Sequence, residues 1–399
     1  MIDRIRSLSQ EISRDITDWR REFHTYPELS FREIETTARI KARLEEMGFT
    51  DMRVGLKGVP TGLIADLGSG KQGPCFALRA DIDALPIQEK SRLPYCSVND
   101  GVMHACGHDA HAAILLGAAR ILKELEAELP GRVRFIFQPS EESPLQSGAH
   151  AMIENGALER VDAIAGLHIW GTLPAGKVGL HAGPFMAASD EWEITIRGKG
   201  GHGGVPHLAT DPIVAAGALL GSLQTLVSRE TDPLESAVVS CCRIAAGTSV
   251  NIIPDSASLE GIVRTFNPSV RAAMPGRMAR LCSGICEAMG CRAEVDYKNV
   301  LPATVNDPIL TERATTVARN VLGADKVMDI PPSMGSEDMS YYLQKVPGVF
   351  LFLGTENGEK GIGRPQHHPE FDVDDDVLPA GSSLLAALAW NFLDQKTTR

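Results

Sequence analysis

The chain lacks several features that would point to well-known classes of protein. It has no GxSxG turn, which disfavours a serine hydrolase. It has no internal repeat and no low-complexity segment, and no apolar run approaches the ~20 residues of a membrane span. Residues 1–19 are amphipathic and mixed in charge, without the apolar core of a signal peptide. We therefore expect a cytoplasmic protein.

An excess of positive charge is also missing. The sequence has 39 Lys and Arg against 51 Asp and Glu, a net charge of −12 at pH 7. Nucleic acids and anionic membranes would not be attracted, so we expect neither as a partner. The eight cysteines form no CxxC pair and no disulfide-dense block. Several lie in apolar runs, where a small buried thiol is the usual explanation. Cys106 is the exception because of its neighbours.

The length predicts more than one domain. At 399 residues the chain exceeds the size at which a single core stops growing. In its first part strands alternate with helices, which predicts an α/β domain with a mainly parallel sheet flanked by helices. From about residue 190 the order becomes β-α-β-β-α-β, that of a ferredoxin-like α+β unit. We predict a catalytic domain of residues 1–186 and 300–399 and an inserted domain of residues 187–299.

One short stretch, HACGHDAH at residues 104–111, concentrates chemistry-bearing side chains. It holds three imidazoles, a thiol and a carboxylate. The run that follows is rich in Ala, Leu and Ile at helical spacing, so the stretch lies at the start of a helix, where His108 and His111 would share a face. Thiolate and imidazole together suit zinc or a similar first-row divalent metal. The alternative is a buried free cysteine beside ordinary surface histidines, which this density of ligands disfavours.

Other candidate residues follow predicted strands or lie in a late loop. In an open α/β sheet, ligands gather outside the carboxyl ends of the strands. Taken alone, Glu141 and Glu142 would be a solvated helix start, and His168 a strand-end histidine bonded to backbone. Directly after an apolar strand, however, one carboxylate can bind metal while its neighbour handles a proton. The candidates are Asp81, Asp83, Glu141, Glu142, His168, His367 and His368.

Ser30 and Glu33 have a more local interpretation. Their spacing fits a capping box, in which each side chain bonds the backbone of the other residue at a helix start. The helix would run to Met47 and stop at Gly48.

These motifs together match a known family. They are RADIDALPI, HACGHDAH, QPSEES, GLHIW, GKGGHGGVPH, NIIPDSASLEGIVRTF, GSEDMSYY and HHPEFD, in the family's order from about Phe23 to the C-terminus. The sequence resembles the M20-type metallopeptidases, specifically the amidohydrolase branch that includes aminoacylase-like, hippurate-hydrolase-like and auxin-conjugate hydrolases. HACGHDAH with a later EE and HHP is a specific combination.

The resemblance implies a site for two divalent metal ions, zinc or manganese. Glu141 would be the general base. His367 is preferred to His368 as a ligand because the family's ligand stands two residues before the proline. Asp83 or Asp109 would orient a ligand from behind, and the sequence does not separate them. The implied ligands are Cys106, His108, Glu142, His168 and His367.

The inserted domain resembles the family's lid and dimerisation domain. The resemblance implies a homodimer or higher homo-oligomer, in which His202 of a neighbouring subunit helps to hold the developing oxyanion. Without the resemblance, the sequence would indicate only an ordinary histidine of a Gly-rich loop. Asn251 and Arg264 match family positions near the substrate, although Arg264 also fits a plain strand residue. His181 stands where relatives often carry Arg.

We therefore expect a metal-dependent amidohydrolase that cleaves the amide bond of small N-acyl amino acids, releasing a carboxylic acid and a free amino acid. A dipeptidase or carboxypeptidase of the same fold is the first alternative, but no residue argues for a pocket that holds a free amine. A catalytically inactive metal-binding scaffold is the second, and an intact Glu141 counts against it.

Overall fold

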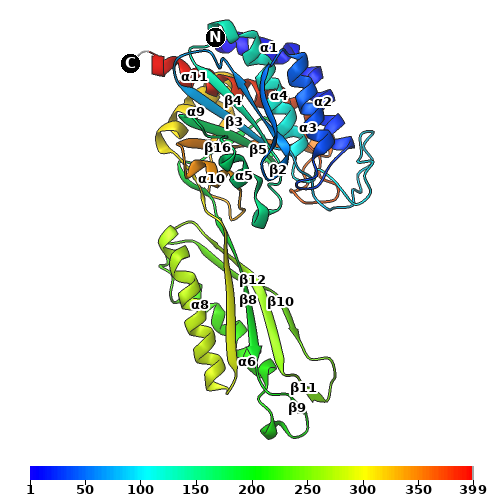
Figure 1. The fold of residues 1–399 in the computed structure, drawn as a ribbon, viewed down its shortest axis with the longest axis vertical. Helices are drawn as coiled ribbons and strands as arrows, with labels where there is room; N and C mark the ends of the chain where they lie inside the picture. The colour runs from blue at the N-terminus through cyan, green and yellow to red at the C-terminus, as the bar shows by residue number, and fades with distance from the viewer. Residues whose placement is uncertain (398–399) are drawn as a thin grey trace. The chain divides into compact units, whose positions relative to one another are not determined.

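The computed structural model describes residues 1–397, which form two compact units. Unit 1 comprises Met1–Phe185, Val305–Pro331 and the chain from Asp338 onward, and unit 2 comprises Met186–Thr304 and Pro332–Glu337. Figure 1 shows the elements of each. The domain boundaries predicted above, 1–186 with 300–399 and 187–299, stay a prediction.

Unit 1 is built on an eight-stranded sheet of order β1-β2-β4-β3-β5-β16-β6-β15. The central pairs β4–β3, β3–β5 and β5–β16 are parallel, as is β6–β15, whereas β1–β2, β2–β4 and β16–β6 are antiparallel. The mainly parallel sheet flanked by helices is thus confirmed. The strands are β1 (Asp51–Leu56), β2 (Val59–Leu67), β3 (Cys75–Asp81), β4 (Arg132–Gln138), β5 (Ala163–Pro174), β6 (Val178–Leu180), β15 (Val327–Asp329) and β16 (Gly348–Glu356).

The helices of unit 1 cover this sheet with apolar side chains. α4 is buried along almost its whole length because Ala, Leu and Ile occupy its several faces, and it packs against α2, α11 and strand β3. The helices are α1 (Ile2–Glu11), α2 (Ser13–Thr25), α3 (Ile34–Glu46), α4 (His108–Glu124), α5 (Gly148–Glu154), α9 (Pro308–Leu322), α10 (Met339–Leu343) and α11 (Leu378–Thr397).

The last helix corrects one expectation. The stretch Asp375–Asp394 is long enough and apolar enough to cross a membrane by length and composition alone, so an apolar run of that length does exist. However, 72% of its most apolar window is buried in the protein. α11 packs against α4 and α9, as the core helix of a globular unit does.

The start of α3 corrects another. Glu33 is its N-cap residue, and no side-chain hydrogen bond caps the helix from that residue. The carboxylate of Glu28 instead accepts hydrogen bonds from the N–H groups of Glu35 and Thr36, at 3.2 and 2.8 Å. The predicted capping box is wrong because tertiary partners, described below, take the side chains of Ser30 and Glu33.

Unit 2 contains a four-stranded antiparallel sheet of order β10-β12-β8-β13. Its long elements follow the predicted order β-α-β-β-α-β, and α6 and α8 pack on β12 over a core that includes Trp192 and Leu259. The elements are β8 (Ala188–Arg197), β9 (Gly201–His202), α6 (Pro212–Leu223), α7 (Thr225–Ser228), β10 (Ala237–Ala246), β11 (Ile252–Ile253), β12 (Ser256–Thr265), α8 (Pro268–Ala288) and β13 (Arg292–Leu301). The short strands β7 (Gly183–Met186) and β14 (Thr304–Asn306) pair where the chain passes between the units.

Candidate metal centre

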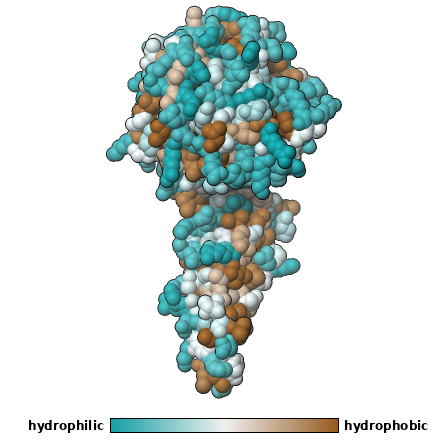
Figure 2. Space-filling model, turned by 90° about the vertical axis from the view of Figure 1, so that its right-hand side faces the viewer, coloured by the Kyte–Doolittle hydropathy of each residue, from teal (hydrophilic) through white to brown (hydrophobic). Residues whose placement is uncertain are grey.

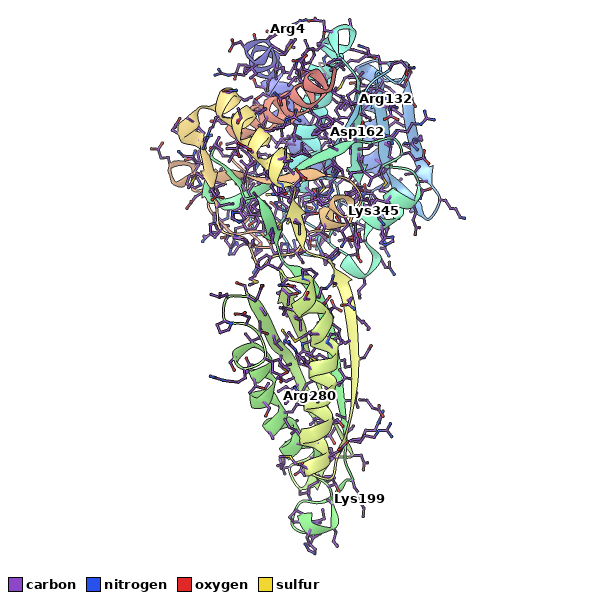
Figure 3. All side chains as sticks on the ribbon, turned by 90° about the vertical axis from the view of Figure 1, so that its left-hand side faces the viewer. Arg4, Arg132, Asp162, Lys199, Arg280 and Lys345 are labelled. Atoms are coloured by element: carbon purple, nitrogen blue, oxygen red, sulfur yellow. The ribbon has the colours of Figure 1, made fainter. Side chains whose placement is uncertain are left out.

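The candidate site lies at the carboxyl ends of the central strands of unit 1. Arg132 and Asp162, at the amino ends of β4 and β5, lie near each other at the opposite edge of the sheet in Figure 3. Glu141 and Glu142 follow the carboxyl end of β4, and Asp83 follows that of β3. Strand β3 lies between β4 and β5 and is parallel to both, so the carboxyl ends of the three strands meet at one edge of the sheet and bring these residues together.

His168 occupies a different position from the one expected. The sequence predicts a strand that ends at Leu167, but β5 continues to Pro174 because its pairing with β16 continues, with Phe352 opposite His168 and Leu353 opposite Ile169. His168 therefore projects from within a strand. That setting restricts its backbone more than a loop would.

The five predicted ligands converge. The Sγ atom of Cys106 lies 3.4 Å from Nε2 of His168, and Oε1 of Glu142 lies 3.4 Å from Nε2 of His367 and 3.9 Å from Nε2 of His108. Two groups of three donor atoms, each within 4.8 Å of one another, share Cys106. One group adds His108 and His168, and the other adds Glu142 and His367.

A glycine and a strained residue place two of these segments. Gly107 has φ +92° and precedes the first residue of α4, so the chain turns between Cys106 and His108 in a conformation that glycine adopts most readily. His367 has φ +66°, which is rare for a residue with a side chain. Its N–H donates to the carbonyl of Ala105 at 2.8 Å, which joins the late loop to the residue before Cys106.

Two imidazoles are oriented by backbone carbonyls. Nδ1 of His108 donates to the carbonyl of Asp83 at 2.9 Å, and Nδ1 of His168 donates to the carbonyl of Ile169 at 2.6 Å. In the neutral imidazole, the form that binds metal, the proton is then on Nδ1, and the lone pair of Nε2 faces the cluster in both. Nε2 of His108 is buried without a hydrogen-bond partner among residues 1–397. Such an orphaned nitrogen beside a thiol and a carboxylate is what a divalent cation would satisfy.

His111 differs, although it shares a helix face with His108. Its Nδ1 donates to the carboxylate of Asp81, and its Nε2 accepts the N–H of Ile169 at 2.8 Å. Both nitrogens are therefore used within the protein. His111 braces the strand that carries His168, and its geometry does not make it a metal ligand.

The electrostatics of the cluster favour positive charge. Burial lowers the pKa of His108, but Asp81, Asp83 and Glu142 raise it to about 10. Burial raises the pKa of the Cys106 thiol, and the nearby Glu142, Glu141 and Asp81 raise it further. Negative side chains thus outweigh positive ones, as they do where a cation belongs. The donor set of sulfur, nitrogen and oxygen fits a first-row divalent metal.

Asp83 and Asp109 have different surroundings. The carboxylate of Asp83 accepts the N–H groups of Glu141 and Glu142, each at 3.0 Å, and lies 3.3 Å from Nδ1 of His108. Asp109 faces α2 instead, where it accepts hydrogen bonds from Arg20 and His24, both at 2.8 Å. Asp83 therefore touches the cluster directly and Asp109 does not.

Arg20 is a functional candidate that the sequence did not indicate. Fully buried, it bonds Asp109 beside His108 and also Asp372, at 2.7 Å, in the loop that follows His367. It therefore ties together two segments that carry predicted ligands. An arginine on an amphipathic helix is normally predicted to lie at the surface. Only the hydrogen-bond partners of Arg20 in the folded protein show that it joins these two segments.

The predicted residues of unit 2 fall into two places. His202 of β9 lies opposite Ile252 of β11, and the N–H of Gly203 donates to the carbonyl of Asn251 at 2.9 Å, so His202 and Asn251 are neighbours. Arg264 lies at the other end of β12, where Nη1 donates to the hydroxyl of Ser189.

Two histidines that the sequence left open bond elsewhere. Nδ1 of His368 accepts the N–H of Glu370 at 3.0 Å, within its own loop. Nδ1 of His181 lies 2.9 Å from Oδ1 of Asp329.

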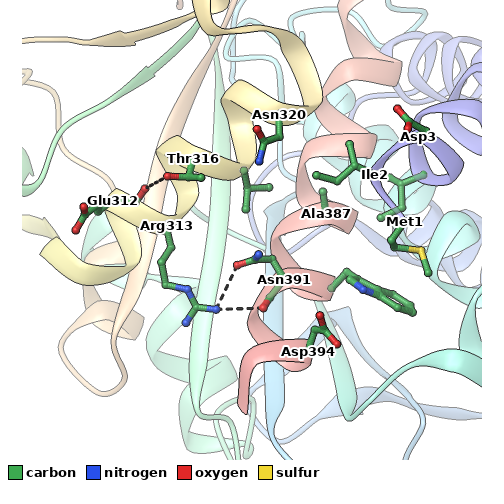
Figure 4. A pocket seen from close by; sticks show the side chains of 13 residues that line it. Met1, Ile2, Asp3, Glu312, Arg313, Thr316, Asn320, Ala387, Asn391 and Asp394 are labelled. Carbon is green, nitrogen blue, oxygen red and sulfur yellow. Dashed lines mark hydrogen bonds between the residues drawn. The ribbon is translucent and has the colours of Figure 1, made fainter. Parts of the chain in front are cut away.

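A cavity of about 630 Å³ in unit 1 lies away from this chemistry, between α1, α9 and α11. Figure 4 shows Arg313 donating to the backbone and side-chain oxygens of Asn391, at 3.1 and 3.2 Å. None of the predicted site residues lines it.

Known proteins resemble this chain along almost its whole length. A family model described as peptidase family M20/M25/M40 matches residues 77–391. N-acetylcysteine deacetylase of Bacillus subtilis is 45% identical over 374 residues, covering 94% of this chain and 96% of that relative. Thermostable carboxypeptidase 1 of Saccharolobus solfataricus is 39% identical over 396 residues, covering 98% and 99%. The crystal structure of a dinuclear metal-binding M20 peptidase from Bacillus subtilis, 40% identical, superposes with a TM-score of 0.85 over 96% of this chain and 99% of the other. With matches of this extent, the chain belongs to peptidase family M20/M25/M40.

Proposed function

We propose that the protein hydrolyses the amide bond of N-acyl amino acids with two divalent cations bound in unit 1. The convergence of Cys106, His108, Glu142, His168 and His367 beside a second acid, Glu141, carries the proposal. The deacetylase relative supports this class of substrate, and the dinuclear metal-binding relative supports two cations.

Cys106, His108, Glu142, His168 and His367 would together hold the two cations. The thiolate among these ligands favours zinc, with manganese as the alternative. Metal analysis of the purified protein distinguishes the two.

Bound cations would supply Lewis acidity that polarises the scissile carbonyl and makes a water acidic at neutral pH. Glu141 lies close enough to take a proton from this water, since one of its carboxylate oxygens is within 4.8 Å of the ligand atoms of His108 and Glu142. It then delivers the proton to the leaving amine. Asp83 holds the backbone of Glu141 and Glu142 and so orients both carboxylates.

We further propose that unit 2 acts as a lid and joins two copies of the chain. β10 is an edge strand of its sheet, and Figure 2 shows hydrophobic side chains over the face of unit 2 that carries it. Ile244 and Ile252 are 50% and 56% exposed. Exposed apolar residues beside an unpaired strand edge favour an interface. His202 of one copy would then stabilise the oxyanion in the other, with Asn251 and Arg264 contacting substrate.

The eight free cysteines favour the cytoplasm as the compartment, because thiols stay reduced there.

A substrate panel tests the proposed activity. Metal-loaded protein is assayed on N-acetyl, N-benzoyl and indole-acyl amino acids beside dipeptides and N-blocked dipeptides. We expect turnover of the N-acyl amino acids. Faster release of a C-terminal residue from N-blocked dipeptides would make the protein a carboxypeptidase, as one relative is named, and no turnover at all would favour the inactive scaffold.

Glu141→Gln tests the mechanism. The variant should keep both metals but lose nearly all turnover, because an amide cannot accept the proton. Glu154→Gln, an exposed glutamate at the end of α5, is the matched control and should be as active as the wild type. Wild-type rates in Glu141→Gln would show that another group is the base.

A further inference from the structure

The segment of residues 28–33 has no part in the function proposed so far, yet it lies against the metal centre. The hydroxyl of Ser30 donates to the carboxylate of Asp83 at 2.7 Å. The N–H of Ala84 donates to the carbonyl of Glu28 at 2.8 Å. The segment is therefore joined to the chain on both sides of Asp83, the residue that orients Glu141 and Glu142.

Glu33 extends this contact to a second strand end. Its side chain is fully buried, and Oε1 accepts the N–H of Ser140 at 2.9 Å and that of Phe31 at 3.0 Å. Oε2 accepts the hydroxyl of Thr61 at 2.6 Å. Burial and the nearby Asp83 raise the pKa of Glu33 to about 7. A carboxyl group placed here at such a cost needs an explanation beyond the local fold.

The backbone at both of its amide donors is unusual. Within residues 1–397 only four non-glycine residues have positive φ, and two of them are Phe31 at +58° and Ser140 at +54°. L-residues with side chains avoid this region unless surrounding contacts hold them there. One oxygen of Glu33 bonds the N–H of both, so it is a contact of that kind.

The consequence falls on the general base. Ser140, Glu141 and Glu142 present three consecutive N–H groups, and buried carboxylates accept all of them. Glu33 takes the first, and Asp83 takes the other two. The direction in which Glu141 leaves the backbone therefore depends on the conformation that Glu33 maintains at Ser140.

We propose that Glu33 is a positioning residue for Glu141, acting through the Ser140 amide. The proposal rests on the proposed function, in which Glu141 moves the proton. A displacement of about 1 Å in a catalytic group can lower the rate by about a hundredfold. The hydrogen bond from the Ser140 N–H requires a side chain long enough to bring an oxygen to that group, and it does not require a negative charge.

Two substitutions separate reach from charge. Glu33→Asp keeps the carboxylate but withdraws it by one methylene, so the Ser140 N–H loses its acceptor. Glu33→Gln keeps a carbonyl oxygen in place at any pH, and its NH2 group can donate to a Thr61 hydroxyl that has turned to accept. We expect kcat to fall about tenfold to a hundredfold in Glu33→Asp, with little change in KM or metal content. Glu33→Gln should stay within a few-fold of wild type.

Glu28→Asp is the matched control. Glu28 lies in the same segment and also accepts backbone N–H groups, but those of α3. Shortening it should weaken the helix start and leave kcat unchanged. An equal loss of kcat in both variants would mean that general loosening of the segment, and not the Ser140 contact, explains the effect.

A readout without substrate keeps the proposal separate from the proposed function. Hydrogen–deuterium exchange of the metal-loaded full chain, followed in peptides that contain the Ser140 amide, should quicken in Glu33→Asp but not in Glu28→Asp or Glu33→Gln. Unchanged exchange in Glu33→Asp would overturn the proposal, as would faster exchange with undiminished kcat. If the wild-type chain cleaves no N-acyl amino acid, the proposed function fails, and the exchange result still decides whether Glu33 holds this backbone.

Discussion

Asp83→Asn replaces one carboxylate oxygen at the centre of the site with an NH2 group and leaves the volume of the side chain almost unchanged. Oδ1 of Asp83 accepts the N–H of Glu141 at 3.0 Å and lies 3.3 Å from Nδ1 of His108. Oδ2 accepts the N–H of Glu142 at 3.0 Å and the hydroxyl of Ser30 at 2.7 Å. An amide offers one oxygen in place of two. Whichever way it turns, its NH2 group faces a buried N–H that previously had an acceptor.

The size of the effect follows from these contacts. A buried donor left without an acceptor costs about 1–3 kcal/mol, and the remaining hydrogen bonds lose the strength that a charged acceptor gives. If the Glu142 segment moves to give the N–H group another acceptor, the Glu142 carboxylate also moves, and metal binding is weakened by a similar free energy. About 1.4 kcal/mol corresponds to tenfold in affinity, so we expect metal to bind about 10- to 100-fold more weakly. His108 keeps its tautomer, because its stronger partner is the backbone carbonyl of Asp83.

The assay is a metal titration of metal-free wild type and variant in a chelator buffer, with bound metal and turnover both followed. Ser30→Ala is the matched control, since it removes only the hydroxyl bond to Oδ2 and leaves both backbone N–H acceptors in place. It should weaken metal binding by much less. An Asp83→Asn protein that folds normally and binds metal within twofold of wild type would refute the reasoning.

Three further predictions concern the metals, unit 2 and the response to acid. Exhaustive chelation should abolish hydrolysis and a divalent ion should restore it; full activity after metal analysis shows a metal-free protein would contradict the site. His202→Ala should lower kcat on the order of a hundredfold or more with metal content unchanged, and loss of metal instead would place His202 among the ligands. Burial favours neutral Glu89, but hydrogen bonds from His24 and Ser91 lower its pKa from 4.5 to about 2. A folded pKa below the unfolded one gives stability that is present above pH 4.5 and is lost as pH falls toward 2. Urea unfolding of metal-free Glu89→Gln should therefore show a shallower loss of unfolding free energy in that window, by at most about 1.4 kcal/mol per pH unit, and slopes equal to wild type would exclude this contribution.

Much of the site could be predicted because its chemistry is local in the chain. The thiol and imidazoles of residues 104–111 stand at a helix start, and adjacent acids follow an apolar strand, so residue type and spacing suffice to indicate a metal centre. The parallel strand order then implies that strand ends meet. The sequence could not predict which nitrogen of each histidine is free. That choice depends on hydrogen-bond partners, such as the carbonyls of Asp83 and Ile169, which the folded chain supplies.

The sequence-based predictions were wrong where residues distant in the chain bond the groups that a local pattern would have used. Ser30 and Glu33 have the spacing of a capping box, but Asp83 and Ser140, distant in the chain, bond their side chains in its place. The predicted end of the strand at Leu167 failed because pairing with a strand almost two hundred residues later continues past it.

The amino-acid sequence alone determined the fold class, the family and the set of side chains able to hold metal, since periodicity, residue chemistry and order along the chain contain that information. Tertiary structure decided how those side chains are used. His108 and His111 are equivalent by spacing, and Asp83 and Asp109 are equivalent by type. They differ in their partners: His111 bonds Asp81 and the N–H of Ile169, and Asp109 bonds Arg20 and His24. Nε2 of His108 has no hydrogen-bond partner among the described residues and faces the cluster, and Asp83 bonds the N–H groups of Glu141 and Glu142. Hydrogen bonds between distant segments set that difference, and they exist only once the chain has folded.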